Sequence, residues 1–240
     1  MSSRRTWVKP LLSVDGLTAS YGEALALREV SLDIAQGEVV TLVGRNGAGK
    51  TTCLRSIMGL HRASGGRITF DGTDITRTSP QKRARLGLGC VPDDRGIYST
   101  LTVEENLILP PVLGPEGWSM ARIAEVFPVL DERRTQMGGQ LSGGEQQMLA
   151  MARVLRMGAR LLLCDEPTEG LSPIFVQEIG RILREVKDHG TPVLLVEQNV
   201  HFARTVADRH YLLAEGRVVE ALTNSEMKDR EHDLLDYLGV

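Results

Sequence analysis

A glycine-rich stretch at residues 44–51 has the clearest chemistry in this 240-residue sequence. It reads Gly-Arg-Asn-Gly-Ala-Gly-Lys-Thr and fits the pattern G-x-x-x-x-G-K-[ST], directly after an apolar run and at the start of a helix-like segment. Glycines let backbone N–H groups approach phosphate oxygens closely, and the positive end of the following helix attracts the same anion. Lys50 is expected to reach the β- and γ-phosphates, and the Thr51 hydroxyl to bind Mg²⁺, which prefers oxygen ligands. A chance glycine-rich turn could show the same pattern, but the predicted strand before this stretch and the predicted helix after it favour a nucleotide site. The residues predicted to line that site are Gly44, Asn46, Gly47, Gly49, Lys50, Thr51 and Thr52.

Two adjacent acids, Asp165 and Glu166, follow the apolar run 161–164. A phosphate loop needs a carboxylate on a neighbouring strand to complete a magnesium site. Asp165 is predicted to hold that metal through a water molecule. Glu166 is expected to face the γ-phosphate and to accept a proton from the attacking water. A solvated acid pair in a strand-to-helix turn is the plainer interpretation, but the wholly apolar strand before the pair favours the functional one.

The stretch 141–147 reads Leu-Ser-Gly-Gly-Glu-Gln-Gln and opens a helix-like segment. Taken alone, Ser142 is only a good helix N-cap. Together with the phosphate loop and the acid pair, the stretch resembles the signature of the ATP-binding cassettes of ABC transporters, and the resemblance runs from about residue 11 to the C-terminus. It implies that two cassettes face each other head to tail, so that Ser142, Gly143 and Gly144 complete the γ-phosphate site of the partner. It also implies that Tyr21 stacks on adenine, with a plain surface tyrosine as the alternative.

Three positions depart from the family pattern. Asp93 stands where a Gln usually touches the metal and the permease, so a carboxylate contact to the metal is expected there. Gln198 replaces a switch His; its amide can donate a hydrogen bond to the γ-phosphate but cannot become positive. The loop after Glu166 usually ends in Leu-Asp and ends here in Leu171-Ser172, which weakens one expected contact across the dimer.

Other stretches are similar to a narrower group. Residues 101–107, 146–150 and 196–199 resemble the cassettes of branched-chain (hydrophobic) amino-acid importers, in which an acidic residue after Val-Pro and a residue other than His after Val-Glu are usual. Residues 168–170, Thr-Glu-Gly, are similar instead to urea and short-amide importers. The resemblance implies an ATP-hydrolysing subunit that energises uptake through a separate permease. It assigns Glu166, Lys50 and Gln198 to catalysis and Thr51, Asp165 and Asp93 to the metal.

The same resemblance implies ATP and Mg²⁺ as ligands. The implied partners are transmembrane permease subunits, a second identical or paralogous cassette and, indirectly, an extracytoplasmic substrate-binding protein. The chain would act peripherally at the cytoplasmic face of the inner membrane and pass motion to the permease mainly through residues 90–115. Two other functions stay open. One is a soluble cassette that acts on DNA or ribosomes, although such proteins usually carry a long coiled coil or a second cassette. The other is an inactive regulatory subunit that binds nucleotide.

Composition limits these choices. Lys plus Arg is 28 and Asp plus Glu is 31, so the formal charge of −3 argues against a protein that coats nucleic acid. Aromatic residues make up 4 %, which predicts an aliphatic core. The three cysteines are too few for a disulfide framework or a zinc site and are expected to be buried in a reducing compartment. No apolar run approaches the roughly eighteen residues of a membrane span, and no apolar signal-peptide segment follows the basic N-terminus.

Short aliphatic strands alternate with helix-like segments, which indicates a parallel sheet covered on both faces. The strands are expected at residues 11–19, 30–34, 38–43, 67–70, 86–91, 161–164, 193–196 and 210–214. The helices are expected at residues 49–59, 102–109, 119–134 with a break at Pro128, 143–157, 173–187, 199–207 and 225–238.

With the resemblance, the predicted fold class is α/β: a P-loop NTPase of the ABC type, with a mostly parallel sheet core, an N-terminal antiparallel β part and an inserted helical subdomain. The chain is predicted to be one domain over 1–240, with a core at about 11–90 and 158–222, the helical subdomain at about 93–157 and a C-terminal helix at about 223–240. The five histidines are interpreted as surface or capping residues, and the basic residues Lys82, Arg83 and Arg85 as a solvated face.

Overall fold

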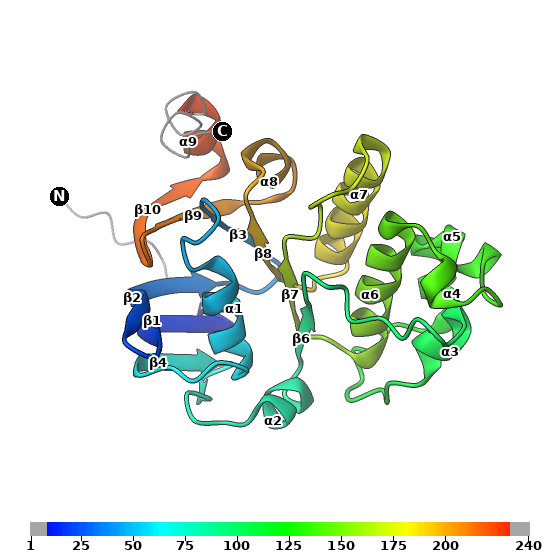
Figure 1. The fold of residues 1–240 in the computed structure, drawn as a ribbon, viewed down its shortest axis with the longest axis horizontal. Coiled ribbons are helices and arrows are strands. Elements are labelled where there is room, and N and C mark those ends of the chain that lie inside the picture. Colours follow the sequence, from blue (N-terminus) through cyan, green and yellow to red (C-terminus); the bar gives the residue numbers. More distant parts are fainter. Residues whose placement is uncertain (1–8, 231–240) are drawn as a thin grey trace.

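The structure, a computed structural model, describes residues 9–230, and the strands in this range form two sheets (Figure 1). The first sheet is antiparallel with the order β2-β1-β4-β5. Its strands are β1 (Leu12–Tyr21), β2 (Ala24–Ile34), β4 (Gly65–Phe70) and β5 (Thr73–Asp74). The second sheet has the order β10-β9-β3-β8-β7-β6 and is parallel except at β10, which runs antiparallel to β9. Its strands are β3 (Val39–Val43), β6 (Leu88–Val91), β7 (Leu161–Asp165), β8 (Val193–Glu197), β9 (Arg209–Ala214) and β10 (Arg217–Thr223).

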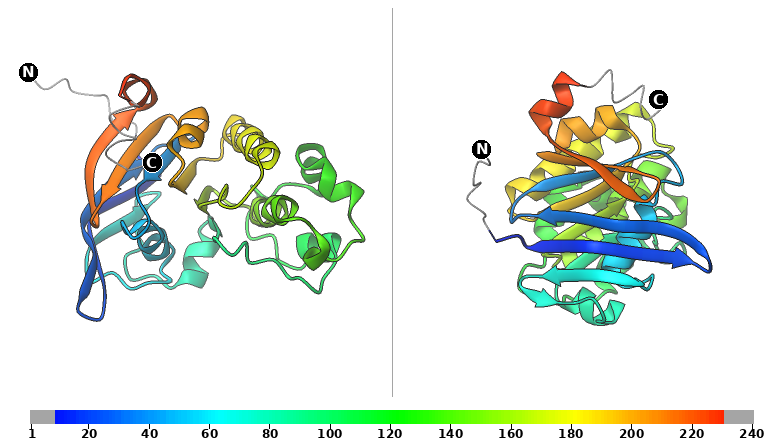
Figure 2. Two further views of the ribbon diagram at one scale, coloured as in Figure 1. Left: turned by 45° about the horizontal axis from the view of Figure 1, so that its top comes forward. Right: turned by 90° about the vertical axis from the view of Figure 1, so that its left-hand side faces the viewer.

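Helices cover both faces of the second sheet, as the apolar strands predict. The α-helices of the described residues are α1 (Lys50–Met58), α2 (Pro80–Arg85), α3 (Val103–Ile108), α4 (Met120–Val126), α5 (Pro128–Glu132), α6 (Gly143–Met157), α7 (Pro173–Asp188), α8 (Val200–Val206) and α9 (Asn224–Asp229). Helix α1 lies between the two sheets, whereas α6 and α7 lie on the opposite face of the second sheet (Figure 2). The predicted α/β fold, with a mostly parallel sheet core and an N-terminal antiparallel β part, is confirmed.

Alternate residues of the central strands build two separate cores. In β7, Leu161 and Leu163 pack with α1 and the first sheet, whereas Leu162 and Cys164 pack with α6 and α7. Successive side chains of a strand point to opposite faces, so a strand covered on both sides is apolar at nearly every position. All five residues of β3, of β7 and of β8 are buried, including the acids that end β7 and β8.

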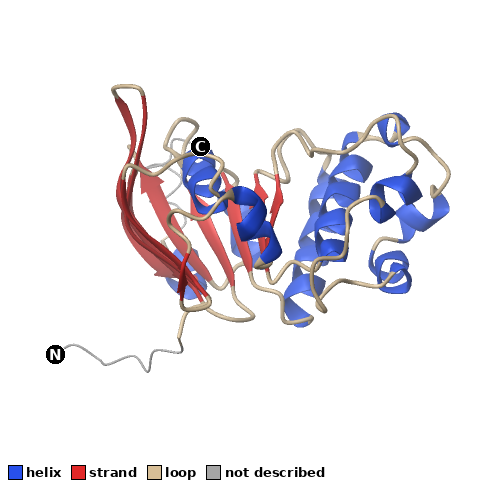
Figure 3. Cartoon of the chain, turned by 90° about the horizontal axis from the view of Figure 1, so that it is seen from below, coloured by secondary structure: helices blue, strands red, loops and turns tan. Residues whose placement is uncertain are grey.

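Helices α3 to α6 gather beside β6, away from the first sheet (Figures 1 and 3). Helix α6 packs against α3, α4 and α5 on one side and against β6 on the other. The Thr102 side chain accepts from the Glu105 amide, and the Glu105 carboxylate accepts from Thr102, which is the capping box expected from the sequence. The boundaries of a helical subdomain at 93–157 stay a prediction.

Several elements differ from the sequence-based expectation. Strand β2 begins at Ala24 instead of residue 30, and neither β10 nor α2 was predicted. Helix α2 interrupts a polar segment that carries no apolar period, and Pro80 stands at its first turn. The segment expected at 119–134 is split into α4 and α5 at Pro128, because proline lacks the N–H that an uninterrupted helix would use. The C-terminal helix begins at Asn224, and its predicted continuation over 231–240 lies outside the described residues.

Two of the surface assignments are wrong. Arg83 is 2 % exposed, and its guanidinium donates to the carbonyls of Ser56 and Ile57 at the C-terminal end of α1. His210 is fully buried: its Nδ1 lies 2.6 Å from Thr41 Oγ1, and its Nε2 lies 3.2 Å from Asn224 Oδ1. Both side chains meet partners that are distant in the sequence.

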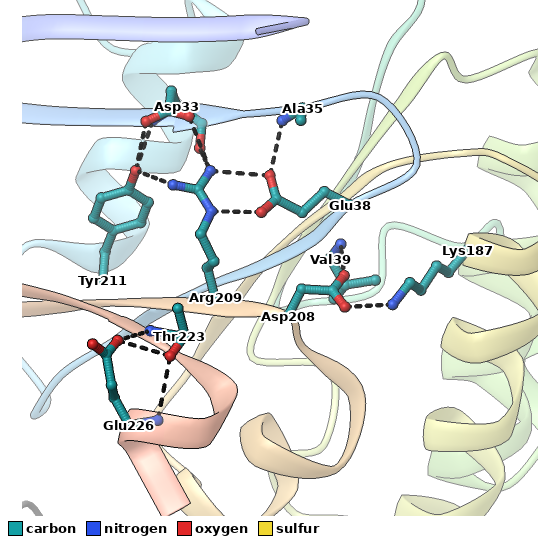
Figure 4. Close-up of polar contacts among 10 residues, drawn as sticks. All are labelled: Asp33, Ala35, Glu38, Val39, Lys187, Asp208, Arg209, Tyr211, Thr223 and Glu226. Atoms are coloured by element: carbon teal, nitrogen blue, oxygen red, sulfur yellow. Dashed lines mark hydrogen bonds and ion pairs between the residues drawn. The ribbon is translucent and has the colours of Figure 1, made fainter. Parts of the chain in front are cut away.

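A polar cluster around Arg209 joins the two sheets (Figure 4). The Arg209 guanidinium pairs with Asp33 of β2 at 2.9 Å and with Glu38, which precedes β3. The hydroxyl of Tyr211, which stands on β9 with Arg209, donates to Asp33 Oδ1 at 2.9 Å. Because Asp33 belongs to the first sheet and Arg209 to the second, the cluster fixes one sheet against the other. Among residues 9–230, the structure contains no helix with the length and apolar character needed to cross a membrane.

Candidate nucleotide site

The glycine-rich loop connects β3 to α1 at the carboxyl edge of the parallel sheet. Gly47 and Gly49 have φ values of +80° and +106°, which side-chain-bearing residues rarely adopt. Asn46 and Gly47 are exposed, Gly44 and Thr52 are buried, and Lys50 opens α1. The loop therefore presents its backbone and the amino end of a helix to the same space, which suits an anion.

Lys50 lies at the centre of the site. Its side chain is 4 % exposed, and its Nζ donates to the carbonyl oxygens of Gly44 at 2.8 Å and Arg45 at 3.1 Å. The same Nζ lies 2.9 Å from Glu166 Oε1, so the structure brings the predicted phosphate-binding lysine and the predicted base together. Glu166 directly follows β7 and has a φ of +45°, so its backbone is in the left-handed region.

Thr51 and Asp165 form a second predicted contact. Thr51 Oγ1 donates to Asp165 Oδ1 at 3.1 Å, from the first turn of α1 to the end of β7. The pKa of Asp165 is raised to about 6, chiefly by burial; the hydrogen bond from Thr51 lowers this pKa, and the charges of Asp93 and Glu166 raise it. A divalent cation beside Asp165 would favour the charged form, because opposite charge lowers a carboxyl pKa.

The fit of this site to a magnesium ion follows from its donor set. Within residues 9–230, no group of three or more His, Cys, Asp and Glu side chains could hold a metal. Hydroxyl and carboxylate oxygens from Thr51 and Asp165 are nevertheless the hard donors that Mg²⁺ takes, usually with one or two carboxylates and substrate phosphates. The residues present therefore fit a magnesium–nucleotide complex better than a metal held by the protein alone.

Asp93 and Gln198 reach the same edge from two further strands. Val91 pairs with Cys164 and Val43 with Glu197, so the ends of β6, β7, β8 and β3 lie side by side. Asp93 follows β6, is exposed, and acts electrostatically on Asp165. Gln198 follows β8 directly and is half-buried. The topology thus gathers all the predicted catalytic and metal-binding residues at one edge.

Glu197 is a buried acid whose role the sequence did not reveal. Its Oε1 accepts from the Thr168 hydroxyl at 2.7 Å and from the Thr168 amide at 3.3 Å, and its Oε2 accepts from the Asn199 amide at 3.4 Å. Burial raises the pKa of Glu197 to about 7, and these hydrogen bonds oppose that rise. An acid at the end of a wholly apolar strand was the available signal, and the same signal singled out Asp165. Glu197 ties the loop after Glu166 to the segment that carries Gln198.

Glu169 adds another carboxyl group near Glu166. Its amide donates to the Glu166 carbonyl at 3.1 Å, which makes a tight turn after β7. A hydrogen bond to the Glu166 side chain, followed by repulsion from its charge, raises the pKa of Glu169. The loop therefore presents two interacting carboxyl groups near Lys50.

The signature stands apart from this cluster. Ser142 caps α6, its side chain accepts from the Glu145 amide, and the Glu145 side chain returns a bond to Ser142. Ser142 is exposed, Gly143 is half-buried and Gly144 is buried; a Cβ on Gly144 would lie 2.1 Å from the Phe175 ring. Helix α6 and helix α1 are on opposite faces of the second sheet (Figure 1). The structure thus does not bring Ser142 to Lys50 within one chain.

Tyr21 lies at the end of β1, where it pairs with Ala24 in a tight hairpin. It is 51 % exposed, and its ring lies 4.3 Å from the His61 ring, centroid to centroid, with an angle of 34° between the planes. The contact leaves much of the tyrosine ring open to solvent. Stacking of adenine on this ring stays a prediction.

The sequence and fold are similar to those of known ATP-binding cassettes. A family model described as ABC transporter matches residues 27–169. The chain is 40 % identical over 228 residues to the high-affinity branched-chain amino acid transport ATP-binding protein BraG of Pseudomonas aeruginosa, which covers 91 % of this chain and 98 % of that protein. It is 37 % identical over 236 residues to the lipopolysaccharide export system ATP-binding protein LptB of Acidithiobacillus ferridurans, which covers 95 % and 97 %. Among solved structures, the dimeric post-hydrolysis state of the cassette MJ0796, bound to ADP and phosphate, has a TM-score of 0.78 and 25 % identity and covers 89 % of this chain and 98 % of that chain.

Proposed function

The chain belongs to the ATP-binding cassette family of ABC transporters, and from this premise we propose that it powers the import of branched-chain or other hydrophobic amino acids through a separate membrane permease. ATP hydrolysis is the reaction of the family. The observation that carries the proposal is the meeting of Lys50 with Glu166 and of Thr51 with Asp165 at one edge of the sheet. The similarity to BraG over nearly the whole chain supports the choice of cargo.

The catalytic roles follow from the positions of these groups. Lys50 would leave Glu166 and the loop carbonyls to bind the β- and γ-phosphates, where its charge stabilises the developing negative charge. Glu166, released from Lys50, would orient the attacking water and accept its proton. Gln198 would donate an amide hydrogen bond near the γ-phosphate. The loop amides around Gly47 and Gly49 would hold the phosphates in line.

The proposed metal ligands are Thr51, Asp165 and Asp93. Bound Mg²⁺ would neutralise phosphate charge and fix the triphosphate geometry. Thr51 contributes a hydroxyl from α1. Asp165 contributes a buried carboxylate that accepts a hydrogen bond from Thr51. Asp93 is exposed and acts electrostatically on Asp165, which suits a contact through water.

We propose that two cassettes, identical or paralogous, form the working unit. Ser142, Gly143 and Gly144 would face the triphosphate bound by the partner's loop, and Tyr21 would stack on adenine in its own site. Two features support this arrangement: the exposed Ser142 stands at the amino end of a 15-residue helix, and the similar cassette MJ0796 forms a dimer bound to ADP and phosphate. The amino end of α6 would then stabilise the partner's phosphate charge.

An apolar groove provides the proposed contact with the permease. It has a volume of about 190 Å³ and lies between the end of α1, strand β6 and the end of α6. Its lining includes Met58, Leu88, Leu113, Val154 and Met157. Two exposed apolar side chains, Leu86 and Val112, stand next to lining residues in the sequence, at 37 % and 50 % exposure. Leu109, at 58 % exposure, stands four residues before Leu113 of the lining. An exposed apolar surface around a groove is typical of a protein interface.

The proposed location is the cytoplasmic face of the inner membrane, where the chain would be held peripherally by its permease. An extracytoplasmic binding protein would deliver the cargo, so the cassette itself would never touch it. The Thr-Glu-Gly sequence at 168–170 favours urea or a short amide as the second candidate cargo. Because the chain is also similar to LptB, the experiment that identifies the cargo must distinguish amino-acid import from lipopolysaccharide export.

The experiment compares uptake in cells that lack the native gene and carry either the wild-type chain or Glu166→Gln. Uptake of labelled leucine, urea and acetamide is measured under the same conditions, with Glu132→Gln, an exposed glutamate of α5, as the matched control. We expect leucine uptake to require Glu166, with the control equal to the wild type. Loss of urea uptake with normal leucine uptake would replace the proposed cargo, and a defect in lipopolysaccharide export alone would overturn import.

A further inference from the structure

The loop that leaves β6 contains an arginine with an unusual backbone. Arg95 has a φ of +66° and is one of five non-glycine residues with a left-handed backbone among residues 9–230. Its amide donates to the Pro92 carbonyl at 3.0 Å, which closes a tight turn around Asp93 and Asp94. A left-handed backbone costs free energy at a side-chain-bearing residue. The turn directs the half-buried Arg95 side chain toward α6.

The Arg95 guanidinium lies against the signature. Its Nη1 donates to Gln146 Oε1 at 2.8 Å. A Cβ on Gly143 would lie 3.1 Å from Arg95 Nη2, so the guanidinium is packed against the first residue of α6. A side chain at position 143 would push the arginine away.

Gln146 also contacts the segment before Ser142. Its side-chain Nε2 donates to the carbonyl oxygens of Leu141 at 3.2 Å and Gly138 at 3.3 Å, and its backbone N–H donates to the Ser142 carbonyl at 2.9 Å. One amide side chain thus accepts from Arg95 and donates to the backbone on the other side of the signature. Gln146 thus links Arg95, which stands two residues after Asp93, to the backbone on both sides of Ser142's neighbour Leu141 and to the first turn of α6.

A second arginine holds the same loop without touching the signature. The Arg153 guanidinium donates to the Gly96 carbonyl and lies 4.5 Å from the centroid of the Tyr98 ring. Arg153 stands on α6 well after Gln146. Its contacts anchor the loop at Gly96 and Tyr98 and do not involve residues 141–146, so Arg153 separates loop anchoring from positioning of the signature.

We propose that Arg95 is a positioning residue for ATP hydrolysis: through Gln146 it sets the signature, Ser142 to Gly144, against the Asp93 loop of the same chain. The inference rests on the proposed function, in which the signature completes the partner's site. The predicted metal-binding loop of one nucleotide site and the phosphate-binding signature of the other are then joined by Arg95 and Gln146. A nucleotide in one site would bias the geometry that this chain offers to the other.

The test uses Arg95→Met in the Glu166→Gln background, in which bound ATP persists. ATP-induced dimerisation is measured by sedimentation, and ADP affinity by calorimetry. Because ADP binding uses the loop of one chain, we expect ADP affinity to remain within about twofold, whereas dimerisation weakens by about tenfold, the effect of losing one hydrogen bond to a charged donor. Arg95→Lys, which keeps one donor, should recover part of the loss.

Two controls make the result specific. Arg153→Met should leave dimerisation within about twofold of the parent. Gln146→Leu should weaken dimerisation as well, and the double variant Arg95→Met/Gln146→Leu should lose less than the sum of the two single losses, because both single variants remove the same Arg95–Gln146 contact. Dimerisation of Arg95→Met equal to the parent, or an equal loss in Arg153→Met, would overturn the inference alone. Failure of the Glu166→Gln parent to bind ATP or to dimerise would overturn the proposed function and the inference with it.

Discussion

Lys50 Nζ lies 2.9 Å from Glu166 Oε1, so the residue predicted to bind phosphate and the residue predicted to activate water are paired with each other. The two side chains are 4 % and 15 % exposed, which makes the pair mostly buried. In the proposed mechanism, a phosphate oxygen takes the place of this carboxylate on Lys50. Binding of ATP and release of Glu166 would then be the same event.

Replacing Glu166 should separate binding from hydrolysis. In Glu166→Gln the proton acceptor is lost, and we expect the rate of hydrolysis to fall by about a hundredfold to ten-thousandfold. Because the carboxylate no longer competes for Lys50, ATP affinity should rise by about fivefold, corresponding to about 1 kcal/mol for a screened ion pair. Single-turnover hydrolysis and equilibrium binding measure the two effects. Unchanged or weaker ATP affinity would contradict the competition, and Glu132→Gln serves as control.

Asp165→Asn should raise the stability of the protein and lower its rate of ATP hydrolysis. Burial raises the pKa of Asp165 to about 6, so at pH 7.5 the folded protein carries a buried charge at a cost. The amide removes that charge, and we expect the free energy of unfolding to rise by about 3 kcal/mol at pH 7.5. Hydrolysis should fall by at least about a hundredfold because a predicted metal ligand is lost. Urea unfolding and ATPase assays on the same preparation check both; a destabilised variant would show that Thr51 needs the carboxylate.

Glu197 should make stability depend on pH. Its pKa in the folded protein is about 7, above the ordinary value of 4.5. A carboxyl group with a raised folded pKa contributes stability that is present below about pH 4.5 and is lost as the pH rises through about 7. Glu197→Gln should therefore match the wild type near pH 5 and exceed its free energy of unfolding by about 3 kcal/mol at pH 8. Urea unfolding at pH 5, 6, 7 and 8 gives the comparison, and parallel pH curves for the two proteins would refute it.

Arg209→Met should weaken the join between the sheets. The substitution leaves Asp33 and Glu38 without their shared cation (Figure 4), and we expect a loss of about 2–3 kcal/mol in the free energy of unfolding. The KM for ATP should not change, because the cluster lies outside the proposed site. Arg217→Met is the matched control: its pair with Glu29 spans 4.0 Å between exposed side chains, so its loss should stay within about 0.5 kcal/mol. Equal losses of unfolding free energy in the two variants would contradict a special role of Arg209 in joining the sheets.

Charges at the apolar groove should uncouple the cassette from the permease. With Leu109→Asp or Val112→Asp, we expect basal hydrolysis to be unchanged and stimulation by the permease in proteoliposomes to fall by about tenfold, because docking would bury a carboxylate. Val219→Asp on β10, at a residue that is 49 % exposed, is the control for a charge placed on an exposed apolar side chain elsewhere. Stimulation that survives both groove variants would place the permease contact on another surface.

The sequence was sufficient for the local parts of the site. The loop between β3 and α1, the acids that end β7 and the cap of α6 each depend on a few adjacent residues, and each stands where the pattern predicted it. Their roles in binding and catalysis stay predictions. The two-sided burial of β3, β7 and β8 also follows from composition alone, since such strands are apolar at nearly every position.

The parts that were missed depend on distant partners. Strand β10 is an edge strand with mostly exposed or half-buried residues, so its pattern resembles a polar turn until β9 is beside it. Arg83 was assigned to a solvated face because nothing near it in the sequence indicates the carbonyls of α1 that bind it. Arg95 gave no signal either, since its contact with Gln146 spans 51 residues. Long-range hydrogen bonds of this kind have no periodicity from which to be predicted.

Helix α6 runs without interruption from Gly143 to Met157, with no proline and with glycine only at its first two positions. Its fifteen residues span about 22 Å. One end carries the cap at Ser142, and the other carries Met157 in the apolar groove. A continuous helix of this length tilts as one body, so a change of angle at Ser142 would also move Met157. In the proposed function, α6 would thereby connect the partner's ATP site directly to the surface that contacts the permease.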